Sequence, residues 1–315
     1  MTAPSAVELS AEPVAADEDV EQAPLPVELP LWQPKLRERI AEAWHSRHLL
    51  PGMALSSVQT FQGRILGRGW FFLRPLWQVF GMALIFGGIF HATAPNGIPY
   101  VLFVVFGFQA FQLWRITIMY ETVSSKQIKV ARNLRIPLLL VPFAILGRVF
   151  ARLSVYWLIA AVVLLYYWIV KGHLYLQLNV RLLVGVAGVA LCLIFAMGIG
   201  LFTSVLYARA RDVKYLLRFF LPVLMFLTPV YYSVHQLPGW AQALSQVNPL
   251  TGVVSMVQWG FLDAATLRPL GVLWSLAAIV LTWSFGLWFF NKLATRFLGV
   301  YRVAGEEEDD DDDMI

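Results

Sequence analysis

Charged residues are scarce in this chain, and most of the acidic ones lie near its two ends. Only 14% of the 315 residues are charged, 58% are hydrophobic and the mean hydropathy is +0.64. Soluble domains carry roughly 25% charged residues. A single soluble core cannot bury this much apolar surface, so lipid is the predicted solvent. Between the acidic ends the sequence has five carboxylates: Glu38, Glu42, Glu121, Asp212 and Asp263.

The motifs of common enzymes are also missing. No stretch reads G-x-x-x-x-G-K-[ST], Gly-x-Ser-x-Gly or His-Glu-x-x-His, which excludes a P-loop, a nucleophile elbow and a zincin site. The single cysteine, Cys192, lies in an apolar run and is interpreted as a buried small hydrophobe. No carboxylate falls in the middle of an apolar run, which argues against an ion-coupled transporter. We predict no catalytic residue, no metal site and no cofactor in this chain.

All 24 Lys and Arg residues lie between the two acidic ends. A basic and very apolar body suits an anionic membrane surface better than nucleic acid. We therefore expect membrane lipid as a partner and no nucleic acid. The acidic ends, residues 1–30 and 303–315, are predicted to be disordered tails.

Six apolar segments are long enough to cross a bilayer, which takes about 20 residues. Lys and Arg number 18 in the segments 31–74, 121–136, 208–218 and 292–302, against three, Lys171, Arg181 and Arg268, on the other side. The positive-inside rule then predicts that both termini are cytosolic. The predicted class is an all-α membrane protein whose body covers residues 69–302. Its predicted spans are 70–92, 99–120, 143–170, 182–207, 215–236 and 270–292.

Residues 31–68 are predicted to form an amphipathic interfacial segment before the first span. Leu36, Ile40 and Trp44 recur at helical spacing with charged residues between them. A Trp-bearing basic helix of this kind lies along a membrane interface. A soluble packing helix is the alternative interpretation.

Two more short helices are predicted between the fifth and sixth spans. The stretch 237–263 is apolar, but Pro238-Gly239 and Asn248-Pro249 divide it into pieces too short to span. Re-entrant or interfacial helices at the outer face fit best, with Trp240 and Trp259 as anchors. We expect them to act as a gate with Trp240, Asn248, Pro249 and Trp259 as its residues.

Two arginines stand out within the third span. Arg148 and Arg152 are one helical turn apart and share a face. Either they snorkel to the cytosolic interface or they face a polar cavity near a translocated anion. The interfacial interpretation is favoured. The glycines of the fourth span are interpreted as close-packing sites: Gly185, Gly188, Gly198 and Gly200.

The order of several short motifs is similar to a known family. RDVKYLL, TPVYY and NPLTGVV follow one another from Arg211, and LRPLWQVF opens the first span, with Arg74 where the family often has Gly. A cytosolic loop ends in ARNLRIP. From about Ala54 to Tyr301 the chain resembles the membrane permease subunit of a type-2 ABC transporter, in the branch that exports polysaccharides such as O-antigen, teichoic acid and capsule.

The resemblance implies a homodimer of six-span subunits in the bacterial inner membrane. It also implies a separate ABC ATPase subunit that binds ATP and Mg, and a lipid-linked polysaccharide as substrate. The loop after the second span is then the docking surface for the ATPase. Its candidate coupling residues are Glu121, Lys126, Lys129, Arg132 and Arg135.

A polysaccharide path needs faces that tolerate many sugars. Aromatic rings pack on sugar C–H surfaces, and Tyr hydroxyls bond sugar hydroxyls. Pro222 and Pro229 are expected to kink the fifth helix beside such a path. Aromatics at span ends are more often interface anchors. The candidate path residues are Trp70, Phe72, Trp77, Phe80, Phe86, Phe226, Tyr231, Tyr232, Arg148 and Arg152.

Three other functions remain open. The same body suits a permease for a drug or a lipid, with a less aromatic path. A membrane transferase acting on lipid-linked sugars would need paired carboxylates, and Asp212 and Asp263 are predicted on opposite sides of the membrane. A non-catalytic assembly subunit is the last alternative.

Overall fold

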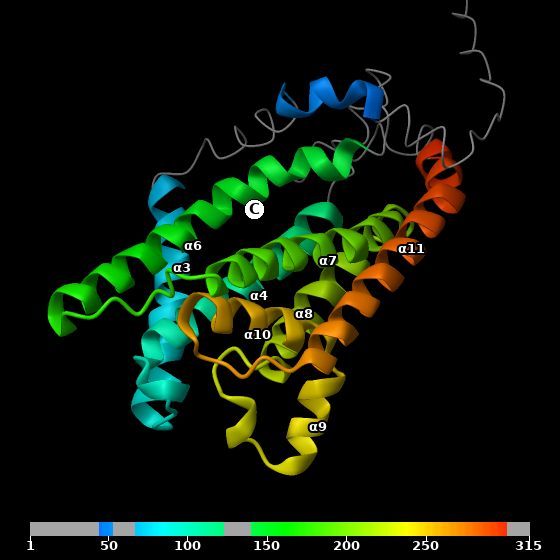
Figure 1. The fold of residues 1–315 in the computed structure, drawn as a ribbon. Helices are drawn as coiled ribbons and strands as arrows, with labels where there is room; N and C mark the ends of the chain where they lie inside the picture. The colour runs from blue at the N-terminus through cyan, green and yellow to red at the C-terminus, as the bar shows by residue number, and fades with distance from the viewer. Residues whose placement is uncertain (1–43, 53–66, 123–139, 301–315) are drawn as a thin grey trace, which may run out of the picture. The chain divides into compact units, whose positions relative to one another are not determined.

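The computed structural model describes residues 44–52, 67–122 and 140–300. The chain divides into Met1–Lys35 and Leu36–Ile315, and every described residue belongs to the second unit. Within the described ranges all regular elements are helices (Figure 1), which confirms the predicted all-α class. Both predicted acidic tails, and Leu36 and Ile40 of the interfacial segment, lie outside the described residues. The middle of that segment, residues 44–52, is seen as a short helix with a 3₁₀ turn, η1 (Ser46–Leu49).

Among the described residues, four helices are long and apolar enough to cross a membrane. Each agrees with a predicted span to within a few residues, apart from the C-terminal end of the last, where the helix is longer. Gly172, at a positive φ of 64°, ends the helix Val141–Lys171 in the left-handed conformation that glycine commonly adopts there. The four are α4 (Tyr100–Thr122), α6 (Val141–Lys171), α7 (Arg181–Arg209) and α11 (Pro269–Val300).

The predicted first span is helical but has a shorter apolar part. It consists of α3 (Gly67–Ala83) followed by a π-helical turn, η3 (Leu84–Ile89). The apolar part covers only Pro75–Ile89. The prediction of a helix is confirmed, and its crossing of the membrane stays a prediction.

The predicted fifth span was wrong at its end. Its helix α8 (Val213–Leu227) has 15 residues, about 23 Å by helical rise, and stops two residues before Pro229. Thr228 is extended, with ψ of 138°, because a residue before proline avoids the helical region. Pro222 is accommodated inside α8, whereas Pro229 ends the helix instead of kinking it. A count of six spans therefore stays a prediction.

Contacts between side chains fix the direction of the long helices. Trp114 packs on Phe195, and Thr122 lies 2.7 Å from Thr203 between their hydroxyl oxygens. These pairs advance together, so α4 and α7 run side by side in the same direction (Figure 1). The Nε1 of Trp283 donates to the carbonyl of Ile194, and further along, the rings of Phe202 and Phe289 meet. Hence α11 also runs parallel to α7.

The helix α6 runs the opposite way. Trp157 contacts Phe106 near the start of α4, whereas the Arg148 guanidinium lies over the ring of Tyr120 near its end. The starts of α4, α7 and α11 therefore share one end of the bundle with the end of α6. This alternation agrees with the predicted topology of these four helices. It places Lys171, Arg181 and Arg268 at that shared end.

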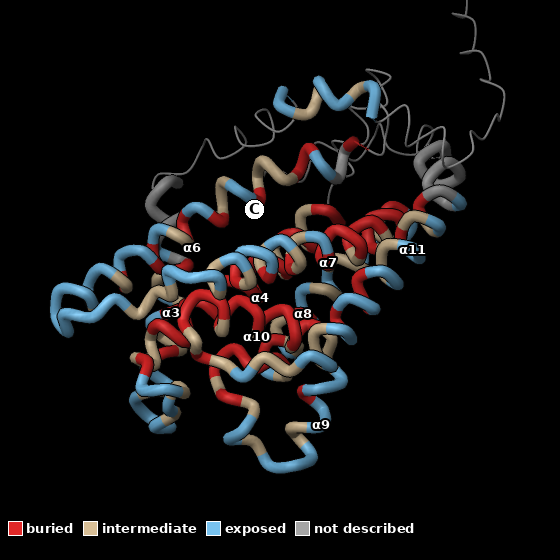
Figure 2. Tube along the Cα trace, in the orientation of Figure 1, coloured by how far each residue is buried: buried red, intermediate tan, exposed pale blue. Residues whose placement is uncertain are grey.

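Two short helices follow α8, namely α9 (Gly239–Val247) and α10 (Pro249–Leu262). Residues of α10 are largely buried against α4, α7 and α11, while most of α8 and α9 is exposed or half-buried (Figure 2). α10 therefore lies inside the helix bundle, and its position relative to the membrane stays a prediction. The sequence of α10 is apolar all round, which is typical of a helix buried on every side.

Glycines bring the central helices together. A Cβ at Gly260 of α10 would overlap the backbone of Gly185 of α7, and one at Gly188 would lie 3.0 Å from the side chains of Met256 and Val257. A Cβ at Gly198 would press on Trp283, and one at Gly200 would press on the side chain of Glu121. The close-packing interpretation of these α7 glycines is confirmed. Cys192 is fully buried, as expected.

Candidate functional site

The predicted aromatic path divides into exposed and buried residues. Trp70 and Phe72 lie in α3, but their side chains are not described. Trp77 and Phe80 follow in α3 and are 77% and 48% exposed. Phe86, in the π-helical turn, faces inward and stacks on Tyr231 at 5.0 Å between ring centroids. Only the first two of these three described residues therefore present a ring to the surroundings.

One face of α8 carries a row of exposed rings. Phe226 is 49% exposed, and Phe219 and Phe220 are more exposed and meet edge to face at 5.4 Å. Tyr215 lies one turn before Phe219 on the same side. We name the exposed large side chains of α8 the aromatic flank: Tyr215, Leu216, Phe219, Phe220, Val223 and Phe226.

Tyr231 belongs to the core in this structure. Its side chain is fully buried, and its hydroxyl donates to the Met225 sulfur at 3.2 Å. Its carbonyl accepts a hydrogen bond from the Tyr100 hydroxyl at 2.5 Å. The half-buried Tyr232 donates to the Phe226 carbonyl at 2.6 Å. The TPVYY motif therefore closes the end of α8 onto α4, and a role of either tyrosine in a path stays a prediction.

The pair Asn248-Pro249 joins three elements at the predicted gate. Its Oδ1 accepts from the backbone N–H of Leu250, which caps α10, while its Nδ2 donates to the Thr228 hydroxyl at 2.9 Å. The carbonyl of Pro249 accepts from the Ser275 hydroxyl of α11. The Asn-Pro pair thus ties the end of α8 and the start of α11 to the start of α10. The gating role itself is not tested by these contacts.

The two predicted tryptophan anchors have different surroundings. Trp240 on α9 is 74% exposed. Trp259 on α10 is half-buried, and the Arg181 guanidinium carbon lies 5.0 Å from its ring centroid. Arg181 also pairs with Asp263 at 2.6 Å. Only Trp240 has the exposure of a surface anchor.

Asp263 is the centre of a junction that the sequence analysis missed. Its carbonyl accepts from Asn96 Nδ2 at 2.7 Å, and it has a positive φ of 58° at the end of α10. Nearby, the backbone N–H of Gln177 donates to the Phe261 carbonyl. We name the set Asn96, Gln177, Arg181 and Asp263 the loop clasp. It joins the loops before α4, before α7 and after α10. The signal in the sequence for this junction was Asp263, a single carboxylate among apolar residues at the end of a predicted helix.

The same contact separates the two carboxylates that a transferase would need. Asp263 is bonded to Arg181, the first residue of α7, whereas Asp212 follows shortly after Arg209, the last residue of α7. A helix of 29 residues is about 43 Å long. Asp212 and Asp263 therefore lie at opposite ends of the bundle, as predicted, and cannot act as a pair.

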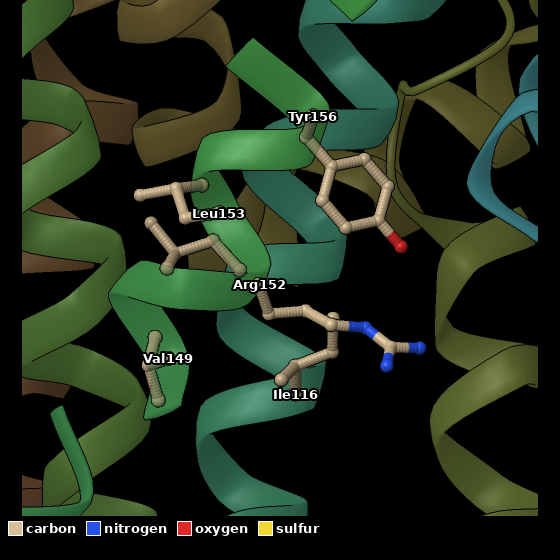
Figure 3. A pocket seen from close by; sticks show the side chains of 6 residues that line it. Ile116, Val149, Arg152, Leu153 and Tyr156 are labelled. Carbon is tan, nitrogen blue, oxygen red and sulfur yellow. The ribbon is translucent and has the colours of Figure 1, made fainter. Parts of the chain in front are cut away.

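Arg148 and Arg152 are half-buried at the seam of α6 with α4. Arg152 lines a shallow cleft with Tyr156 of its own helix and Ile116 of α4. Figure 3 shows the Arg152 guanidinium and the Tyr156 hydroxyl extending to the same side of α6. The remaining lining residues are Leu113, Val149 and Leu153.

Glu121 does not lie on an exposed docking surface. It is 1% exposed and packs against Gly200 where α4 crosses α7. The next residue, Thr122, forms a hydrogen bond between its hydroxyl and that of Thr203. The other predicted coupling residues lie outside the described residues: Lys126, Lys129, Arg132 and Arg135.

The fold defines an α-helical, multi-pass membrane protein, and comparison with known families narrows the class. A family model described as ABC-2 type transporter matches residues 56–262, which is more than half of the chain. The chain therefore belongs to the ABC-2 type transporter family, and it is a transmembrane transport subunit. Membership implies an ABC ATPase as a partner. A search among curated proteins found no match.

Proposed function

We propose that this chain is the membrane half of an ATP-driven exporter that moves lipid-linked polysaccharide across the bacterial inner membrane. It acts as a homodimer of six-span subunits whose termini are cytosolic. A separate ATPase subunit binds ATP and Mg and performs the hydrolysis. The chain itself carries no catalytic residue or cofactor.

The observation that carries this proposal is the aromatic flank of α8 in a member of the ABC-2 type transporter family. Three phenylalanines and one tyrosine are exposed there within twelve residues. Aromatic rings offer large flat apolar faces with few internal rotations to restrict. Such faces pack against sugar rings of different kinds, so a growing glycan can slide along them. A second copy of α8 across a dimer axis completes the path.

The direct test uses the chain with its ATPase in proteoliposomes. We expect no ATP hydrolysis from the purified chain alone, and export of lipid-linked glycan when the ATPase and ATP are added. Deletion of the gene is expected to remove the surface glycan. If deletion leaves the glycan intact and changes tolerance to a drug, the chain is a drug or lipid permease and the polysaccharide proposal fails.

The coupling surface is tested by reversing charge in the loop after α4. Arg132→Glu with Arg135→Glu is expected to abolish co-purification of the ATPase and export, because the docking contact loses two cations. The helices should keep their thermal stability. Arg268→Glu, just before α11 at the other end of the bundle, is the control. It should keep both the co-purification of the ATPase and export. Undiminished co-purification of the Arg132/Arg135 variant would remove this assignment.

A further inference from the structure

The seam between α4 and α6 places two cations where a lipid headgroup would meet them. Arg148 and Arg152 are separated by one turn of α6, and both are half-buried against α4. The Arg148 guanidinium carbon lies 5.4 Å from the centroid of the Tyr120 ring. The Arg148 guanidinium therefore lies at the seam, and Arg152 lines the cleft there.

The depth of the pair follows from the other end of the helix. Tyr166 and Trp168 are 58% and 54% exposed, and Lys171 is the last residue of α6. Exposed aromatic residues beside a terminal lysine mark the headgroup level of a bilayer. A hydrocarbon core of about 30 Å takes about 20 helical residues. Counting back from Trp168 brings the opposite headgroup level to Arg148, with Arg152 one turn deeper.

The surroundings of Arg152 allow it to reach that level. It lines the cleft with Ile116 of α4, and its side chain extends past Ile116 on the same side of α6 as the Tyr156 hydroxyl (Figure 3). A side chain of this length can carry its charge from one turn below up to the headgroup level, which is the snorkelling arrangement. Two guanidinium groups then line one seam, one at the headgroup level and the other within reach of it.

We propose that this seam binds the phosphate of an anionic glycerophospholipid from the surrounding bilayer. Guanidinium groups match phosphate oxygens with two parallel hydrogen bonds. Basic recesses between transmembrane helices on the cytoplasmic side recognise anionic headgroups. The lipid holds α6 against α4 and is not the transported substrate. Arg148 and Arg152 therefore leave the list of path residues.

The first experiment uses the unaltered full-length protein. It is reconstituted in vesicles of equal phosphatidylglycerol and phosphatidylethanolamine, extracted gently and weighed by native mass spectrometry. One retained phosphatidylglycerol per chain is expected. Equal retention of both lipids contradicts the proposal. So does displacement of the lipid by millimolar inorganic phosphate, or by a polyprenyl-linked glycan when the vesicles also contain it.

The second experiment changes the site. Arg148→Gln with Arg152→Gln is expected to lower retention of phosphatidylglycerol about 25-fold, at about fivefold for each arginine removed. Arg211→Gln, an exposed cation between α7 and α8, is the control and should retain the lipid. A double variant that retains the lipid but loses export would return both arginines to the substrate path and overturn the proposal. Should the double variant fail to fold, the lipid selectivity of the unaltered protein still decides the matter.

Discussion

The packed centre and the aromatic flank are built in opposite ways. The packed centre consists of α4, α7 and α10, and its glycines let the backbones of these helices touch. Most side chains of α4 and α10 are buried. The aromatic flank of α8 lies beside it with its large side chains exposed. Neither region is more polar than the other, so hydropathy does not distinguish them. The difference lies in which side chains the chain itself covers.

The comparison separates the part of the molecule that maintains the fold from the part whose side chains can contact something else. Helices in lipid gain little from apolar burial, so the centre depends on close contact at small residues. The flank contributes little to that contact and has its rings free for something outside the chain. We infer that the centre maintains the fold and that the flank meets the substrate or the second copy.

The largest expected effect comes from the centre. Gly260→Ala places a Cβ into the backbone of Gly185 and is expected to cost about 3 kcal/mol, because overpacked positions force helices apart. The midpoint of thermal unfolding in detergent measures this loss. Gly81→Ala in α3 is the matched control, since a Cβ there meets no atom within 4 Å. Equal midpoints for the two variants would show that α7 and α10 do not depend on close contact.

An intermediate effect, on export rather than stability, is expected at the flank. Phe219→Ala with Phe226→Ala should lower export about tenfold, the loss of two stacking contacts of roughly 0.7 kcal/mol each. Thermal stability should be nearly unchanged because both rings are exposed. Phe150→Ala, an equally exposed ring on α6, is the control and should export normally. If the flank variant exports like the control, the flank is not the path.

The smallest expected effect lies in the loop clasp. Asp263→Asn removes the ion pair with Arg181 but keeps a residue that tolerates positive φ, so a loss of about 0.5 kcal/mol is expected. Asp263→Ala should cost about 1 kcal/mol more, because alanine is strained at φ of 58°. Thermal midpoints of the two variants compare these costs. A larger loss for asparagine than for alanine would contradict the role given to the backbone.

Much of the fold could be predicted from the sequence because lipid imposes simple lengths. The four long helices needed only runs of about 20 apolar residues, and the glycines of α7 signalled close packing. The end of α8 was missed because Pro229 was expected to kink a helix that it terminates. The steric effect of proline on Thr228 was the physical signal.

The candidate site was less predictable, because residue type does not reveal which face of a helix is covered. Phe86 and Phe226 are both phenylalanines beside Tyr231, yet one is stacked inward and the other is half exposed. Glu121 was predicted as a coupling residue of the docking surface, but it packs against Gly200, where there is no side chain, and is buried. The pairing of Arg181 with Asp263 joins residues far apart in sequence, which a single sequence does not indicate.

The central claim is that parallel α4, α7 and α11 sort their ends into a basic cytosolic face and an external face. Single thiols at Arg211→Cys and Arg268→Cys, in a chain whose only native cysteine is buried, test it directly. In intact cells an impermeant maleimide should label position 268, and it should label position 211 only after the membrane is opened. Labelling of position 211 from outside, with position 268 protected, would contradict the account.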